Sequence, residues 1–163
     1  MEDQNKSEIE NPKSELKVPT MAQMTAEGRQ PDILFWVGCA GSFDERAQKI
    51  TRDICKILHH VGISYAVLGT EESCTGDPAK RAGNEFLFQM QAITNIEVLN
   101  AYNVKKIVTA CPHCFNTIKN EYPGLGGNYL RIGSIDIFYT FNIDILFTRF
   151  GLFKHLGTTR AAT

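Results

Sequence analysis

The sequence predicts an α/β protein with a Rossmann-like parallel sheet and flanking helices. Three apolar runs, at residues 33–37, 64–69 and 105–109, are each followed by a segment with helical periodicity. Continuous apolar runs are typical of strands that are covered on both faces, as they are in parallel sheets. The repeated strand–helix order favours crossover connections, which bring successive strands into parallel pairing.

The first half of the predicted fold is marked by glycines and by a capping pattern. The strand 33–37 ends at a turn of small residues, Gly38 to Gly41. Ser42 and Glu45 have the Ser-x-x-Glu spacing of a capping box, which predicts that a helix begins there. Apolar residues then recur at helical spacing, and Gly62 is expected to end this helix before the second strand begins.

The second half contains a longer predicted helix, at residues 79–100, and the third strand. That strand leads directly to Cys111, after which an amphipathic segment continues to about Tyr122. Residues 128–132 are expected to supply a fourth strand. Residues 135–147, rich in aromatic and β-branched side chains, are expected to supply a strand pair. The predicted inner face of the long helix consists of Phe86, Met90, Ile93, Ile96 and Leu99.

Composition limits the class of protein. The chain has 163 residues, of which 43% are hydrophobic and 21% charged, which suits one globular domain with a proper core. A formal charge of −1 gives no reason to expect nucleic acid as a partner. Five cysteines, an odd number, without a secretory signal argue against a disulfide scaffold and favour a reducing cytoplasm. No membrane span is expected.

Composition also divides the chain into three parts. Residues 1–30 are polar and are expected to form a flexible leader with a short helix at about 21–28. Residues 31–129 form the predicted cysteine-rich α/β domain. Residues 130–163 form an atypical tail whose composition suggests a truncation or a shifted reading frame.

Four of the five cysteines follow the predicted strands. Cys39 ends the first strand, Cys74 lies in the loop that leaves the second, and Cys111 ends the third, with Cys114 one helical turn further on. The carboxyl ends of parallel strands share one edge of the sheet, where open α/β sheets bind ligands. The four thiols are therefore expected to meet, as the ligand set of Zn²⁺ or of an iron–sulfur cluster. Cys55, inside the first helix, is expected in the core.

Other interpretations remain open at the level of the residues. Four thiols also suit a structural zinc domain that only mediates assembly, and Cys111 with Cys114 suits a metal-free thiol–disulfide enzyme. Separate, half-buried core cysteines are the simplest alternative. The turn after the first strand lacks the signatures of phosphate-binding and dinucleotide-binding loops, so nucleotide binding is disfavoured. Lys80 and Arg81 either offset the charge of a thiolate site or form a solvated helix start.

Three motifs carry a resemblance to a known family: residues 35–41, 72–85 and 110–114. The middle motif includes the run Gly76-Asp77-Pro78-Ala79-Lys80-Arg81, and the last is Ala110-Cys111-Pro112-His113-Cys114. With these motifs the chain resembles the cysteine-rich, or CCG, domain family over residues 21–129. That family includes a cysteine-rich subunit of heterodisulfide reductase and the iron–sulfur subunits of glycerol-3-phosphate, glycolate and lactate oxidation systems.

The chain departs from the family pattern in three respects. Ser73-Cys74-Thr75-Gly76 stands where the family has adjacent cysteines before a glycine. Family members usually carry two copies of the domain, whereas this chain has one. The resemblance also stops near Tyr129. With four cysteines in place of five, the noncubane cluster of heterodisulfide reductase is disfavoured, and a cubane 4Fe-4S cluster or a zinc site is favoured.

The resemblance implies an iron–sulfur protein that transfers electrons within an oxidoreductase complex and is not a self-sufficient enzyme. Cys39, Cys74, Cys111 and Cys114 are the expected ligands, with zinc as the alternative metal. Gly41, Thr75 and His113 are expected to donate hydrogen bonds to the sulfurs. The implied partners are a flavoprotein or a ferredoxin-type subunit, and through a partner the membrane quinone system. The implied location is the cytoplasm, peripheral to the membrane through that partner.

Overall fold

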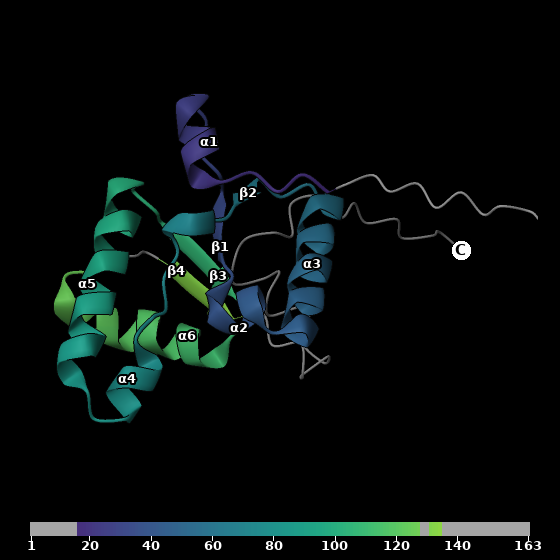
Figure 1. Cartoon of the computed structure of the whole chain (residues 1–163). Helices are drawn as coiled ribbons and strands as arrows, with labels where there is room; N and C mark the ends of the chain where they lie inside the picture. The colour runs from purple at the N-terminus through teal and green to yellow at the C-terminus, as the bar shows by residue number, and fades with distance from the viewer. Residues whose placement is uncertain (1–15, 128–130, 135–163) are drawn as a thin grey trace, which may run out of the picture.

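The computed structural model describes residues 16–127 and 131–134, which form a parallel sheet with helices on both faces (Figure 1). Four strands make up the sheet in the order β2-β1-β3-β4. Every neighbouring pair is parallel, which confirms the predicted α/β class. The strands are β1 (Ile33–Trp36), β2 (Tyr65–Ala66), β3 (Lys106–Thr109) and β4 (Arg131–Ser134).

The helices divide between the two faces of the sheet. Figure 1 shows α3 on one side and α4, α5 and α6 on the other, with α2 near the ends of β1 and β3. The helical elements are α1 (Met21–Ala26), α2 (Gly38–Phe43), α3 (Glu45–His60), η1 (Gly69–Glu71), α4 (Asp77–Arg81), α5 (Glu85–Ala101), α6 (Pro112–Asn116), η2 (Thr117–Glu121) and η3 (Tyr122–Leu125).

All four residues of β1 are buried, because each face of the sheet has its own core. Leu34 and Trp36 belong to the core under α5 and α6, whereas Ile33 and Phe35 belong to the core under α3. Side chains alternate between the two faces along a strand, so a strand covered on both sides needs an unbroken apolar run. This is the physical reason that the run 33–37 predicted the strand.

The packed part of the chain begins before residue 31. Thr20 caps α1, and Met21 and Met24 of that helix are buried in the core that also contains Leu34. Backbone hydrogen bonds join Val67 to this segment, since Met21 N–H donates to the Val67 carbonyl at 2.9 Å. The predicted short helix is therefore present. The later part of the segment expected to be a flexible leader contributes to the core.

The capping box predicted at Ser42 and Glu45 is wrong. The Ser42 hydroxyl instead donates to the Gly38 carbonyl at 2.9 Å, within the short helix α2. Asp44 caps α3, because its Oδ1 accepts the Ala47 N–H at 2.8 Å. The predicted helix end is correct, with Gly62 just beyond α3 at a φ of +71°.

The helix predicted at 79–100 is divided into α4 and α5, and its predicted inner face is partly wrong. Gly83, at a φ of +80°, and Asn84, whose side chain accepts the Leu87 N–H at 3.1 Å, separate the two helices. The exposed side chains include Phe86, Met90 and Ile93, at 75%, 52% and 44%. The buried residues of α5 are Phe88, Ala92, Asn95, Ile96 and Leu99.

The other predicted strands agree in place but differ in length. β2 has two residues, since the chain after it forms an isolated parallel bridge between Thr20 and Val67 and then turns into η1. β4 runs parallel to β3, from the pair Lys106–Arg131 onward. Residues 128–130, part of the predicted fourth strand, and the predicted strand pair at 135–147 lie outside the described residues.

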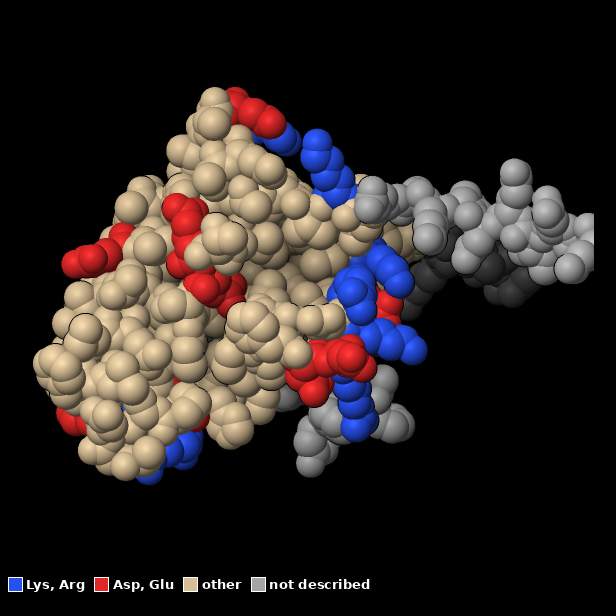
Figure 2. Space-filling model, viewed as in Figure 1, with Lys and Arg blue, Asp and Glu red and all other residues tan. Residues whose placement is uncertain are grey.

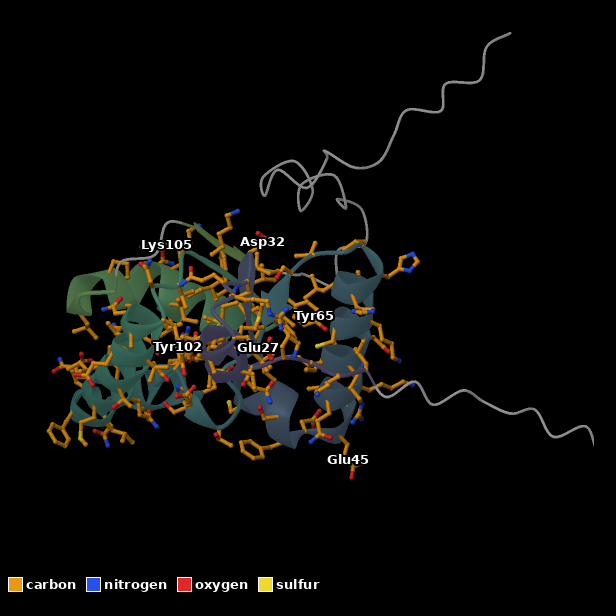
Figure 3. The ribbon with its side chains drawn as sticks, turned by 90° about the horizontal axis from the view of Figure 1, so that it is seen from above. Glu27, Asp32, Glu45, Tyr65, Tyr102 and Lys105 are labelled. Carbon is orange, nitrogen blue, oxygen red and sulfur yellow. The ribbon has the colours of Figure 1, made fainter. Side chains whose placement is uncertain are left out.

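The helix α3 packs through its apolar side and presents charged residues outward. Figure 3 shows Tyr65 beside this helix, and the Tyr65 hydroxyl donates to the Cys55 carbonyl at 3.1 Å. On the face shown in Figure 2, basic side chains gather on the α3 side of the molecule. None of the described helices is long and apolar enough to cross a bilayer.

The two positive-φ glycines beside α4 offer a matched test of the fold. A Cβ at Gly76 (φ +86°) would lie 2.8 Å from Phe88 Cδ2, whereas a Cβ at Gly83 (φ +80°) meets nothing within 4 Å. We expect Gly83→Ala to cost about 1–2 kcal/mol of unfolding free energy from backbone strain alone. Gly76→Ala adds a steric cost of roughly 1–3 kcal/mol. Urea unfolding followed by circular dichroism measures both; equal losses would contradict the close approach.

Candidate metal centre

The parallel pairing of β1 with β3 brings two cysteine-bearing turns together. Trp36 lies opposite Thr109 in the register, so both strands end at the same level. Gly38, in the turn after β1, approaches the next turn so closely that a Cβ there would lie 3.2 Å from Cys114 Sγ and 3.9 Å from Cys111 Cβ. Chain order also reverses between β1 and β3, which is where open α/β sheets bind ligands.

Cys111 and Cys114 are held by the first turn of α6. Cys111 is the N-cap residue, and its Sγ accepts the Cys114 N–H at 3.5 Å. Pro112 follows at the first helical position, where its fixed φ and missing N–H are tolerated. The Cys111 N–H donates to Thr109 Oγ1 at 3.2 Å, which ties the turn to the end of β3. Cys111 is half-buried and Cys114 is buried.

The two thiols of this turn differ in acidity. Hydrogen bonds from the Cys114 side chain and from the backbone N–H groups of Cys114 and His113 lower the pKa of Cys111 to about 5. The hydrogen bond with Cys111 and burial raise the pKa of Cys114. Of the two thiols, Cys111 is thus the more acidic, and Cys114 holds its proton more tightly.

A buried asparagine holds the loop that carries Cys74. Asn95 of α5 is fully buried, and its Oδ1 accepts hydrogen bonds from Ser73 N–H at 3.3 Å and Ser73 Oγ at 2.9 Å. Its Nδ2 donates to the Cys74 carbonyl at 2.9 Å and to Tyr122 Oη at 3.1 Å. The Tyr122 hydroxyl in turn donates to the Thr75 carbonyl at 3.1 Å. Three successive backbone positions are thus fixed from α5 and η3.

Cys39 lies in the short helix α2 and is the exposed member of the four. Desolvation and the neighbouring thiols of Cys74 and Cys111 raise the pKa of Cys39, while the Ala40 backbone N–H acts in the opposite direction. Cys39 in turn raises the pKa of Cys114. Cys39 therefore lies within electrostatic reach of the other three thiols.

The thiols are gathered without forming a closed coordination shell. Among residues 16–127 and 131–134, no group of three or more His, Cys, Asp or Glu side chains is arranged tightly enough to hold a metal ion as it stands. The assignment of Cys39, Cys74, Cys111 and Cys114 as ligands remains a prediction. Cys55 lies away from this edge, buried in the core under α3, which confirms its expected place.

The three residues expected to donate hydrogen bonds to sulfur occupy different positions. The Thr75 hydroxyl donates to Cys114 Sγ at 3.9 Å. His113 is exposed, and its backbone N–H reaches Cys111. Gly41 instead packs against α3, where a Cβ would lie 2.8 Å from Thr51 Oγ1. The geometry therefore supports Thr75 and the His113 backbone, whereas Gly41 has a packing role.

Two residues that hold the cysteine-bearing loops were not predicted from the sequence. Asn95 lies among the buried residues of α5, but it is polar, so a pattern of apolar residues does not include it. Glu72 belongs to the family motif, and its two oxygens accept the N–H groups of Val37 at 3.1 Å and Gly38 at 2.5 Å. Burial raises the pKa of Glu72 to about 7, although both backbone hydrogen bonds act in the opposite direction. In the sequence, Asn95 could have been recognised as a polar residue at a position that helical spacing places in the core, since buried polar side chains need hydrogen-bond partners.

Lys80 and Arg81 are engaged in ion pairs around α4. Arg81 Nε pairs with Asp77 Oδ2 at 2.8 Å, and Lys80 pairs with Glu121 of η2. Asp77 also accepts the Thr117 hydroxyl at 3.2 Å. These contacts tie α4 to the helical path that follows Cys114. The two basic side chains are thus paired with carboxylates.

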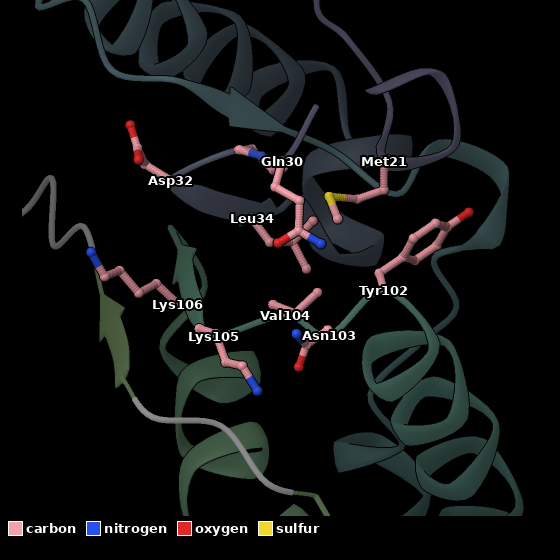
Figure 4. A pocket seen from close by; sticks show the side chains of 10 residues that line it. Met21, Gln30, Asp32, Leu34, Tyr102, Asn103, Val104, Lys105 and Lys106 are labelled. Atoms are coloured by element: carbon pink, nitrogen blue, oxygen red, sulfur yellow. The ribbon is translucent and has the colours of Figure 1, made fainter. Parts of the chain in front are cut away.

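A small hollow lies at the opposite edge of the sheet, near the amino ends of β1 and β3 (Figure 4). Its lining includes Asp32, Leu34, Tyr102 and Lys105, and its volume is about 40 Å³. The hollow has room for only a few water molecules. The cysteine-bearing turns lie at the other edge of the sheet.

A parallel α/β sheet with four cysteines at its carboxyl edge defines a cysteine-rich α/β domain. The family model described as "Cysteine-rich domain" (CCG) matches residues 33–119, and the chain belongs to this family. The matched range runs from the start of β1 to the middle of η2, and it contains all four thiols. No solved protein structure was found that matches the chain.

Relatives of known name are longer proteins. The probable iron-sulfur-binding oxidoreductase FadF of Bacillus subtilis is 47% identical over 125 residues, which cover 75% of this chain and 18% of that protein. The EtfAB:quinone oxidoreductase of Syntrophomonas wolfei is 46% identical over 103 residues, 63% of this chain and 14% of that protein. A subunit of the dihydromethanophenazine:CoB–CoM heterodisulfide reductase of Methanosarcina barkeri is 31% identical over 109 residues, 65% of this chain and 26% of that protein. The chain thus spans a fraction of each relative.

Asn95 can be tested as the anchor of the Cys74 loop. Asn95→Ala leaves the Ser73 N–H and the Cys74 carbonyl without their partner, and we expect a loss of roughly 2–4 kcal/mol in unfolding free energy. The alkylation rate of Cys74, followed by mass spectrometry, should rise in the same variant. The control is Asn100→Ala, at an exposed position of α5. Equal behaviour of the two variants would rule out the anchoring role.

Proposed function

We propose that this chain binds an iron–sulfur cluster through Cys39, Cys74, Cys111 and Cys114 and acts as an electron-transfer component of an oxidoreductase complex. The observation that carries the proposal is the convergence of three cysteine-bearing segments on the carboxyl edge of β1 and β3. Membership of the cysteine-rich domain family, and the iron–sulfur names of its relatives, support the same function.

The residues present fit such a group. Thiolates from four cysteines are the usual ligands of iron–sulfur clusters. Gly38, whose missing Cβ leaves room beside Cys114 Sγ, keeps the approach to the thiols open. Ser73, at the place of the family's additional cysteine, directs its hydroxyl to Asn95. A four-thiolate set of this kind favours a 4Fe-4S cluster, which when bound supplies a one-electron carrier.

The surrounding residues would tune such a carrier. Hydrogen bonds to the sulfurs, burial and net charge set the reduction potential of iron–sulfur sites. Here the Thr75 hydroxyl donates to Cys114 Sγ, and the Cys114 N–H donates to Cys111 Sγ. Thr75 and Cys114 are buried, so they form the dry side of the site. Cys39 is exposed and forms the side open to a partner.

The partners follow from the same proposal. The chain is proposed to receive or deliver electrons through a flavoprotein or a ferredoxin-type subunit, with a quinone or a disulfide at the other end. One relative is named as an EtfAB:quinone oxidoreductase and another as part of a heterodisulfide reductase, which supports both choices. Substrate chemistry would belong to these partners. The proposed location is the cytoplasm, with membrane contact through a partner.

Iron, acid-labile sulfide and zinc analysis of the anaerobically purified chain tests this function. We expect iron and sulfide in near-equal amounts, with the visible absorption of a cluster. Changing any one of the four cysteines to serine should remove most of the iron and bleach the chromophore. Cys55→Ala, in the other core, is the matched control and should keep both.

Two outcomes would overturn the proposal. Zinc without sulfide would indicate a structural Cys₄ site. Dithiol activity that survives Cys39→Ser and Cys74→Ser without any iron would indicate a thiol–disulfide enzyme based on Cys111 and Cys114.

A further inference from the structure

Glu72 joins the two segments that carry Cys39 and Cys74. It stands in the loop between η1 and α4, two residues before Cys74, and it is partly buried. Its side chain crosses to the turn after β1, where Oε1 accepts the Gly38 N–H at 2.5 Å and Oε2 accepts the Val37 N–H at 3.1 Å. A single carboxylate therefore holds the backbone immediately before Cys39.

The backbone N–H groups of the turn before Cys39 need a hydrogen-bond acceptor. α2 begins at Gly38, and its N-cap residue, Val37, makes no side-chain capping hydrogen bond. The first N–H groups of a helix have no acceptor within the helix, and buried N–H groups without an acceptor are costly. Gly38 is buried at a φ of +78°, so the direction of its N–H is set by an unusual backbone conformation. Glu72 supplies the acceptor for both N–H groups.

We propose that Glu72 is a positioning residue of the metal centre, which fixes the β1–α2 turn so that it presents Cys39 beside Cys74. The inference rests on the proposed function. The other thiols have anchors of their own, since Cys111 and Cys114 share one helical turn and Cys74 is held by Asn95. Cys39 is exposed, and the bidentate contact of Glu72 is what ties its turn to the Cys74 loop.

The carboxylate also shapes the electrostatics near the sulfurs. While Glu72 accepts them, the N–H groups of Val37 and Gly38 would not be free to donate to the sulfur of a cluster. When ionised, the carboxylate also adds its negative charge to that of the thiolates. Both effects lower the reduction potential of a cluster. Removing the carboxylate is therefore expected to raise the midpoint potential.

Two variants of Glu72 and one control separate the effect of side-chain length from the effect of the carboxylate charge. Glu72→Asp keeps the charge but shortens the side chain by one methylene, and Glu72→Gln keeps the length but replaces one acceptor oxygen. The matched control is Glu71→Gln at the neighbouring exposed position, whose carboxylate accepts the Tyr102 hydroxyl at 2.7 Å. Hydrogen exchange of the whole chain reports on the turn directly. We expect roughly tenfold faster exchange of the Val37 and Gly38 amides in Glu72→Asp, a smaller rise in Glu72→Gln and none in Glu71→Gln.

Metal content and redox titration provide the second readout. We expect both Glu72 variants to retain less iron and sulfide than the wild-type chain, with a higher midpoint potential in Glu72→Gln, whereas Glu71→Gln matches the wild type. Faster exchange with unchanged iron content and midpoint potential would reduce Glu72 to a structural role and overturn the inference. Unchanged exchange would overturn it as well. A wild-type chain without iron and sulfide overturns the proposed function itself, which is a separate result.

Discussion

The pairing of β1 with β3 is the interaction on which the site depends. Leu34 lies opposite Ile107 and Trp36 opposite Thr109, and the cysteine-bearing turns follow directly. A slip of one residue would move every side chain of a strand to the other face. Trp36 would then leave the core under α5, where it is fully buried. The packing of the two apolar cores thus fixes the register of β1 and β3. The register in turn fixes how closely the two cysteine-bearing turns approach each other.

Buried polar side chains hold the backbone of the turns that the strands bring together. Asn95 and Thr109 are fully buried, and each makes hydrogen bonds to the backbone of a cysteine-bearing segment. Glu72 does the same for the turn after β1. Irregular backbone near a core needs hydrogen-bond partners, because its N–H and C=O groups are not satisfied by a sheet or a helix. The cost of burying these side chains is offset by the backbone groups they satisfy.

The sequence was sufficient to place β1, β2 and β3, because their order follows from topology, whereas the joining of four cysteines into one ligand set stays a prediction. Apolar runs marked the strands, and parallel strands send Cys39 and Cys111 to one edge whatever the details of packing. The break at Gly83 and the inner face of α5 could not be predicted in the same way. Apolar residues of α5 such as Phe86 and Met90 are exposed, while the polar Asn95 is buried for its hydrogen bonds, so apolar periodicity assigned part of the face incorrectly. Glu72 was visible as part of a motif, but its partners lie 34 and 35 residues away.

The thiols at this edge differ in acidity and influence one another. Cys111 and Cys114 alone would resemble a redox pair, with one acidic thiol and one that resists ionisation. Cys39, however, is affected by both Cys74 and Cys111, and each neighbour raises its pKa. Like charges at short range oppose the ionisation of all four thiols together. The fold nonetheless brings four thiols to one edge, and Gly38 leaves room beside Cys114. A positively charged centre would stabilise such an arrangement. A reaction of two thiols does not require it.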